Sequence, residues 1–211
     1  MEILAIGAHP DDIEIGCGGL IIKAASAGHS IHILNLTRGE AGGGDANLRE
    51  NEARKSAKAI GAKNLWFGEY KDTELVPNGT LVNSIEEYVR KVNPLLILTH
   101  SIHDEHHDHR AVGYATIEAG RYCQNILAYE NPLTKDFKPE VFVDISDVVK
   151  KKTKLLMFYQ TQKNKTYLKE NAIYGLASYR ALQSRLEAVT FAEAYQVVKL
   201  KILDQFLNSS L

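Results

Sequence analysis

The chain has 211 residues, of which 45% are hydrophobic and 24% charged, and its formal net charge is -1. This length suits one domain with a substantial core, and the near-neutral charge argues against a broad nucleic-acid or anionic-membrane surface. Two cysteines make a disulfide framework improbable, and no apolar run reaches membrane-spanning length. We expect one cytoplasmic domain over residues 1–211 that binds a small molecule, binds neither nucleic acid nor membrane, and forms a homo-oligomer.

Apolar runs that predict strands alternate with stretches of helical periodicity along most of the chain. The predicted strands are Ile3–Ala8, Ser30–Thr37, Leu65–Phe67, Leu95–Thr99 and Val141–Asp144. The predicted helices run from Asp11 or Asp12 to a stop at Gly28, from a cap at Asp45 or Asn47 through Ile60, and over Thr80–Val92, Ala111–Tyr122 and Val148–Gln160. Ala172–Leu186 reads as partly helical, and Phe191–Leu200 fits a strand or a helix. This alternation predicts an α/β fold, a Rossmann-like, mostly parallel sheet with helices on both faces.

Two groups of residues are expected to have no functional role. Lys150, Lys151, Lys152 and Lys154 form a charged run that is typical of the solvated face of a helix. Cys17 and Cys123 each fall inside a predicted helix, where a small apolar side chain packs well.

Two short polar stretches follow predicted strands and have the same chemistry. Ser101 to Arg110 follows Leu95–Thr99, and five of the eight histidines lie here or just before it: His100, His103, His106, His107 and His109. Ala8-His9-Pro10-Asp11-Asp12-Ile13-Glu14 follows the first strand. In open α/β sheets, sites form beyond the carboxyl ends of the strands. We therefore expect the two stretches to meet and to bind a metal.

Spacing indicates which side chains converge. His9 and Asp12 are three residues apart across a strand-to-helix turn, and His106 and His109 are three apart, as on one face of a helix. The first pair with one histidine of the second gives three ligands and leaves a position for water, as in catalytic zinc sites. Asp11 could then act as a general base. The alternatives are two helix-start carboxylates and a surface loop with adventitious metal affinity.

These residues resemble a known family. Ala8-His9-Pro10-Asp11-Asp12 together with His106-His107-Asp108-His109 is similar to the paired signature of the zinc-dependent PIG-L/LmbE N-acetylglucosaminyl deacetylases. Asp104 matches the aspartate that precedes the second motif, and Tyr159-Gln160-Thr161-Gln162 resembles a later segment of the family. The order of the motifs is like that of the bacterial branch with the bacillithiol-pathway deacetylases.

The resemblance implies a role for each matching residue. His9, Asp12 and His109 would be the zinc ligands, Asp11 the general base, and Arg49 a substrate-binding residue. His106, in its protonated form, would stabilise the oxyanion or donate a proton to the leaving amine, and Asp108 would orient or polarise His106. The implied reaction is removal of the acetyl group from an N-acetylglucosamine-type sugar or glycoside, such as the malate glycoside of bacillithiol biosynthesis.

Two departures from the family pattern concern the substrate. His107 stands where the family often has proline, and Tyr70-Lys71-Asp72-Thr73 replaces a Pro-Asp-Gly/Arg element. The rival interpretations are a deacylase of another amide, a non-catalytic metal- or sugar-binding protein, and a dinucleotide-binding domain. A dinucleotide-binding domain would carry Gly-x-Gly-x-x-Gly between the first strand and its helix, and this chain has His9-Pro10-Asp11-Asp12 there instead. Iron(II) would accept the same ligands as zinc.

Overall fold

A seven-stranded mixed sheet forms the centre of the molecule in the computed structural model, which describes residues 1–201. The strand order is β3-β2-β1-β4-β5-β7-β6. The strands are β1 (Glu2–Gly7), β2 (Ser30–Asn35), β3 (Asn64–Phe67), β4 (Leu96–His100), β5 (Asn125–Tyr129), β6 (Val141–Asp144) and β7 (Ala192–Lys199). The first five are parallel, and β7 runs antiparallel to both β5 and β6.

Strand β1 lies at the point where the strand order reverses. It pairs with β2 on one side, Ile3 opposite Ile31, and with β4 on the other, Ile3 opposite Leu96. The connections from these two strands therefore leave in opposite directions and open a crevice between them, which is where doubly wound sheets bind their ligands. The loops that follow β1 and β4 contain the two predicted clusters.

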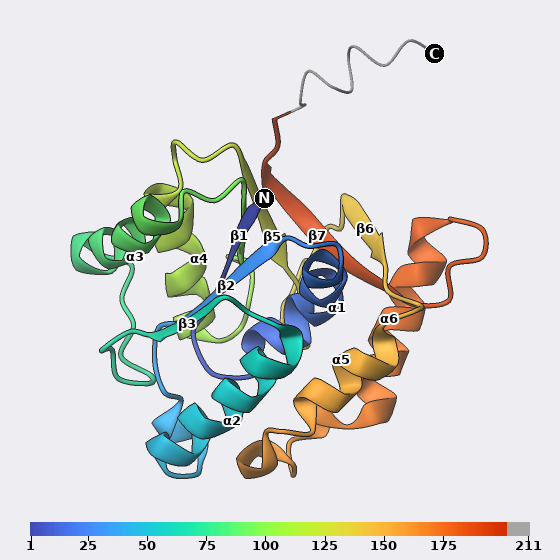
Figure 1. The fold of residues 1–211 in the computed structure, drawn as a ribbon, viewed down its shortest axis with the longest axis horizontal. Helices are drawn as coiled ribbons and strands as arrows, with labels where there is room; N and C mark the ends of the chain where they lie inside the picture. The colour runs from blue at the N-terminus through green and yellow to red at the C-terminus, as the bar shows by residue number, and fades with distance from the viewer. Residues whose placement is uncertain (202–211) are drawn as a thin grey trace.

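Helices cover both faces of the sheet (Figure 1). They are α1 (Asp12–Ser26), α2 (Ala46–Ile60), α3 (Gly79–Val92), α4 (His107–Ala119), α5 (Val149–Leu156) and α6 (Glu170–Ser184), with short 3-10 turns at Glu40–Gly42, Gln160–Gln162 and Thr166–Leu168. α3 and α4 pack on one face through a core that includes Leu4, Leu34 and Ile97. α1, α2 and α5 share a second core on the other face with Ile3 and Ile33. Alternate residues of β1 thus enter opposite cores, which is why its sequence is apolar from Ile3 to Gly7.

The α/β class, the mostly parallel sheet and the helices on both faces are confirmed. The predicted strand at Val141–Asp144 has the observed bounds, and Phe191–Leu200 is strand β7. Asp45 caps α2 by accepting hydrogen bonds from the N–H groups of Asn47 and Leu48, and Gly61 ends that helix in the left-handed conformation. Of the predicted domain over residues 1–211, the last ten residues lie outside the described part.

Several predictions about elements were wrong. Strand β5 was not predicted, because its five residues show no alternation of apolar and polar side chains. α4 begins at His107 rather than Ala111 and ends at Ala119, so Cys123 lies in the turn beyond it. α5 ends at Leu156 rather than Gln160. Lys152 is buried rather than solvated.

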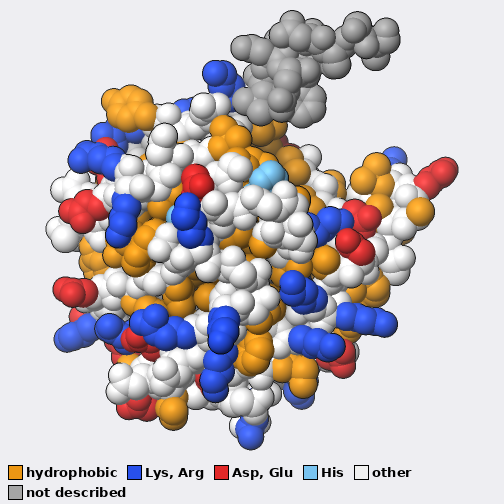
Figure 2. Space-filling model, in the orientation of Figure 1, with side chains coloured by type: hydrophobic (Ala, Val, Ile, Leu, Met, Phe, Trp, Pro, Cys, Tyr) orange, Lys and Arg blue, Asp and Glu red, His pale blue; other side chains and the backbone are white. Residues whose placement is uncertain are grey.

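Among the described residues, no helix is long and apolar enough to cross a membrane. Both cysteines are free thiols, as expected. On the face shown in Figure 2, lysine and arginine side chains are scattered among acidic and uncharged ones.

Candidate active site

The loop after β1 and the start of α1 contain the first cluster. The backbone N–H of His9 donates to Asp12 Oδ2 at 2.8 Å, which folds the loop back on the first turn of α1. Asp12 is the first residue of this helix, and its carboxylate is buried. Burial alone would raise the pKa of Asp12, but the positive charges of His109 and His100 hold it well below its usual range.

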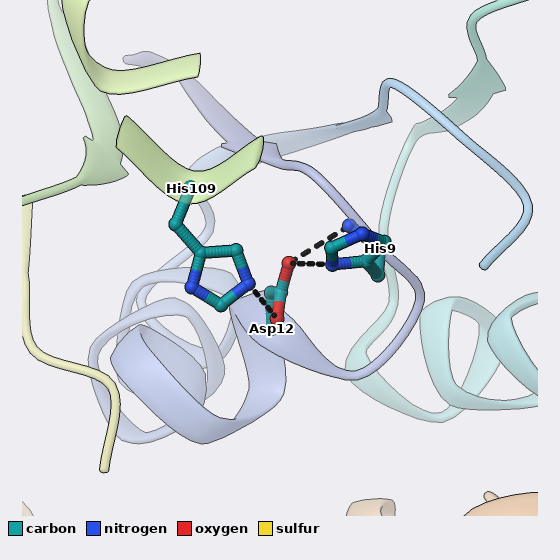
Figure 3. Close-up of side chains that lie close together, drawn as sticks. All are labelled: His9, Asp12 and His109. Atoms are coloured by element: carbon teal, nitrogen blue, oxygen red, sulfur yellow. Dashed lines mark hydrogen bonds and ion pairs between the residues drawn. The ribbon is translucent and has the colours of Figure 1, made fainter. Parts of the chain in front are cut away.

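The second cluster reaches the first at the Asp12 carboxylate. His109, in the first turn of α4, lies with Nε2 3.2 Å from Asp12 Oδ1, and His9 Nδ1 lies 3.4 Å from Asp12 Oδ2. Figure 3 shows the two rings on either side of the aspartate. One ligand atom from each of the three side chains lies within 4.8 Å of the other two. The predicted ligands His9, Asp12 and His109 therefore lie together, all of them buried.

Carboxylates contact the other ring nitrogen of each histidine. His109 Nδ1 lies 3.1 Å from Asp104 Oδ1. His9 Nε2 lies 2.8 Å from Asp72 Oδ1 and 3.1 Å from Asp108 Oδ2. Although burial opposes it, these carboxylates and Asp12 raise the pKa of His109 to about 9 and that of His9 well above its usual range. A carboxylate on the far nitrogen fixes the orientation of a metal-binding imidazole and increases its basicity.

This donor set fits a divalent metal. Two imidazole nitrogens and one carboxylate suit zinc or iron(II). His9 Nε2 and His109 Nδ1 each lie within 3.1 Å of a carboxylate oxygen, and His9 Nδ1 and His109 Nε2 face Asp12. A positive ion between them would balance the surplus of carboxylates around the two rings. The three residues can therefore hold the metal.

Asp11 has surroundings unlike those of Asp12. Its backbone is in the left-handed region with φ 97°, a strained conformation for a residue other than glycine. It takes the N-cap position of α1, but its side chain makes no capping hydrogen bond. Asp11 Oδ2 is buried without a hydrogen-bond partner among the described residues. Burial and the neighbouring charge of Asp12 raise the pKa of Asp11 to about 8.

Arg49 is buried on α2 beside this aspartate. Its Nη2 donates to the Pro10 carbonyl at 2.9 Å and lies 3.8 Å from Asp11 Oδ1. Its Nη1 donates to the Gly39 carbonyl. The guanidinium thus joins the loop after β1 to the loop after β2, and it adds a positive charge next to Asp11.

His106 and Asp108 lie at the start of α4. The His106 ring is half-buried, and its Nδ1 accepts a hydrogen bond from the backbone N–H of Asp108 at 3.2 Å. This contact places the proton of the neutral ring on Nε2. Burial and the charges of His109 and His9 lower the pKa of His106. The carboxylate of Asp108 accepts from the N–H groups of Thr73 and Leu75 and contacts His9, so its link to His106 runs through the backbone.

A cavity of about 310 Å³ opens over these groups. It is lined by His9, Asp11, Asp12, Ile15, Ala41, Gly42, Arg49, Asp72, Thr73, His106, His109, Asn131, Pro132, Leu133, Gln162, Lys165 and Tyr167. Every predicted site residue except Asp108 contributes to this lining.

Comparison with known proteins agrees with this geometry. A model of the PIG-L family, GlcNAc-PI de-N-acetylase, matches residues 4–120, which is more than half of the chain. The chain belongs to the PIG-L family.

Two curated relatives and one solved structure illustrate the similarity of this PIG-L protein to others. The uncharacterized deacetylase YaiS of Escherichia coli is 33% identical over 152 residues, covering 69% of this chain and 82% of that protein. The diacetylchitobiose deacetylase of Thermococcus kodakarensis is 30% identical over 186 residues, covering 76% and 70%. A conserved protein of Thermus thermophilus superimposes with a TM-score of 0.86 at 23% identity, covering 95% of this chain and 96% of that one.

The sequence predicted no specific role for three residues of this candidate site, although His100 belongs to the histidine cluster. Asp72 contacts His9, as described above. His100, at the end of β4, lies with Nε2 3.1 Å from Asp12 Oδ2, and burial with the charge of His109 lowers its pKa to about 4. Asn131 Nδ2 lies 3.4 Å from Asp12 Oδ1. His100 could have been recognised as the last residue of a strand, and Asp72 as part of the element that departs from the family pattern. Asn131 follows strand β5, which was not predicted.

Proposed function

We propose that this PIG-L protein is a zinc-dependent N-deacetylase that hydrolyses the acetamide of an N-acetylglucosamine-type sugar or glycoside. The observation that carries this proposal is the difference between Asp11 and Asp12. Asp12 faces two histidine nitrogens, whereas Asp11 presents an unpartnered carboxylate oxygen beside the same three ligands. A donor set for a metal next to a free base is the arrangement that hydrolysis of an amide requires.

The ligands His9, Asp12 and His109 would hold the ion. A zinc ion bound there would act as a Lewis acid that activates the amide carbonyl and the attacking water. Asp11 accepts the proton of that water. Without a metal, burial and the charge of Asp12 raise the pKa of Asp11 to about 8. A cation bound at Asp12 would lower that pKa, because a positive charge favours the ionised carboxylate, which is the form that accepts a proton.

His106 and Arg49 serve the rest of the reaction in this proposal. His106 carries its proton on Nε2 and donates a hydrogen bond to the carbonyl oxygen as that oxygen becomes negative. It needs no positive charge for this role, which agrees with its lowered pKa. The protonated Asp11 then donates this proton to the amide nitrogen as the carbon–nitrogen bond breaks, so that the products are acetate and the free amine. Arg49 fixes the Pro10 carbonyl beside Asp11 and lines the cavity that receives the sugar.

Asp108 acts on both histidines of this mechanism. Its carboxylate orients His9, and its backbone N–H sets the tautomer of His106. We assign it a positioning role rather than direct contact with substrate, since its side chain is fully buried beneath the cavity.

The substrate class rests on the diacetylchitobiose deacetylase relative and on the cavity volume of about 310 Å³, which is in the range of small-molecule sites. The test is an assay for free amine on a panel of N-acetylglucosaminides with malate, inositol, lipid or sugar aglycones. Release of amine that stops after chelation and returns with zinc is the expected result. Zinc binding without amine release from any member would favour a deacylase of another amide or a non-catalytic binding protein.

A further inference from the structure

Helix α1 is interrupted soon after it begins. Cys17 has φ -138° and ψ 19°, which are not helical values. The break separates residues 12–16, which carry the Asp12 carboxylate, from residues 18–26, which form the body of the helix. A segment of about one turn makes too few internal hydrogen bonds to be stable on its own. Its position must therefore be set by contacts from other elements.

Two buried side chains supply contacts at the break. Lys152 of α5 donates from Nζ to the Ile15 carbonyl at 2.7 Å and to Glu193 Oε1 at 2.7 Å. Glu193 of β7 accepts from the N–H groups of Gly19 at 2.6 Å and Leu20 at 2.8 Å. In a regular α-helix the N–H of Gly19 would donate to the Ile15 carbonyl. Here the ion pair connects these two groups across the break.

The charges match the ends of the two segments. The carboxylate of Glu193 lies at the amino-terminal end of residues 18–26, and the ammonium of Lys152 at the carboxyl-terminal end of residues 12–16, as the helix dipole favours. Their side chains are only 3% and 7% exposed. A Cβ atom at Gly19 would lie 3.0 Å from Glu193 Oε1 and 2.4 Å from Ile145, so glycine allows the close approach.

We propose that the Lys152–Glu193 ion pair positions the first segment of α1 for metal binding. The Ile15 N–H bonds to the Asp11 carbonyl at 3.0 Å, so the contact at the Ile15 carbonyl is linked to Asp11 by this bond and to Asp12 through the helical segment that Asp12 and Ile15 share. Ile15 also lines the cavity. Lys152 and Glu193 are positioning residues that act through Asp12 and Ile15. This inference rests on the metal ligands proposed above.

The test compares two charge-neutral double variants of the full chain with the parent. Lys152→Met/Glu193→Leu removes all contacts at the break but keeps apolar volume, a replacement that buried ion pairs often tolerate. Lys152→Met/Glu193→Gln keeps an acceptor for the N–H groups of the second segment. Thr153→Val is the control, because Thr153 is buried on the same helix and its hydroxyl bonds only within α5. Each protein is measured for zinc Kd by competition with a chelator, and for thermal unfolding without metal.

We expect the Met/Leu variant to fold without metal and its zinc Kd to rise on the order of tenfold, the range for residues that orient ligands. The Met/Gln variant should show a smaller rise, and Thr153→Val none. A folded Met/Leu variant with the parent Kd overturns the inference, as does an equal rise in Thr153→Val. If Met/Leu does not fold, a parent-like Kd in Met/Gln overturns it. A parent chain that binds no zinc would instead overturn the proposed metal site.

Discussion

Asp11 and Asp12 are adjacent in the chain, yet their carboxylates have different surroundings. Asp12 Oδ2 accepts the His9 N–H, and its two oxygens face His9 and His109. Asp11 Oδ2 has no partner among the described residues, and its backbone is strained. The turn from β1 into α1 thus directs one carboxylate into the ligand set and holds the other beside it. This difference underlies the predictions that follow.

Removal of a ligand should remove the metal. We expect the purified parent to hold one zinc or comparable divalent ion per chain, and His9→Ala and His109→Ala to lose it. Each variant leaves two ligands where three are needed for tight binding. Elemental analysis after dialysis measures the metal content. Full metal retention in both variants would refute the assignment of ligands.

Asp72 should tune the metal site without touching the ion. Asp72 Oδ1 lies 2.8 Å from His9 Nε2. Burial alone would raise the pKa of Asp72, but the contact with His9 lowers that pKa to about 2. Asp72→Asn keeps the shape but loses the charge that makes His9 more basic. Zinc affinity should fall about tenfold, as measured by chelator competition. Asp147→Asn, an exposed carboxylate paired with Lys23, is the control and should bind zinc like the parent. Equal affinities in all three proteins would rule out this role.

Arg49→Ala should lower kcat/KM by about 10- to 100-fold, because the guanidinium holds the two loops in place beside Asp11. The metal should be retained, because Arg49 does not contact the side chain of a metal ligand. Arg49→Lys keeps the charge but cannot contact both the Pro10 and Gly39 carbonyls in the same way, so it should recover only part of the activity. Steady-state kinetics with metal analysis on the same samples decides. Unchanged efficiency in Arg49→Ala would mean that this arginine has no part in the reaction.

Acid stability should depend on Glu2, at the opposite end of β1. The pKa of Glu2 is lowered from 4.5 to about 2, mainly by its hydrogen bond with His32 and to a smaller extent by its hydrogen bond with Ser30. Because the folded pKa is the lower one, the carboxylate stabilises the fold above pH 4.5, and this contribution is lost as the pH falls toward 2. Glu2→Gln should cost about 1 kcal/mol at pH 6 after solvent screening. In urea unfolding of the metal-free chain, that difference should shrink between about pH 5 and pH 3; a constant difference would contradict the assignment.

The fold class and the meeting of the two polar clusters could be predicted because each depends on local signals, whereas the choice of His109 over His106 as a ligand came from the family resemblance. Apolar runs marked the strands, and His9, Asp12 and His109 follow two strands whose carboxyl ends meet at one edge of the sheet. Strand β5 could not be predicted, since a five-residue buried run is compatible with a strand or with a helix. Asn131 enters the site only through the tertiary fold, from a segment without a local signature, and Asp72 lies in a segment where this chain departs from the family pattern.

Lys152 illustrates a different limit of the sequence. Within a run of lysines it has the composition of a solvated helix face, and its neighbours Lys150 and Lys151 are exposed as that composition predicts. Only the rotation of α5 against α1 and the position of Glu193, 41 residues later, place it in the interior. The local sequence pattern does not encode the long-range pairing of charges.

The most direct test of the account is zinc content and turnover measured together in Asp11→Asn and Asp12→Asn. Asp11→Asn keeps the size of the side chain but cannot accept a proton. It should fold and retain zinc while losing turnover by on the order of 10²-fold or more. Asp12→Asn should lose zinc and turnover together. An Asp11→Asn protein that keeps both zinc and near-parent turnover would contradict the mechanism. An Asp11→Asn protein without zinc, beside an Asp12→Asn protein that is fully loaded, would show that the two aspartates have the opposite roles.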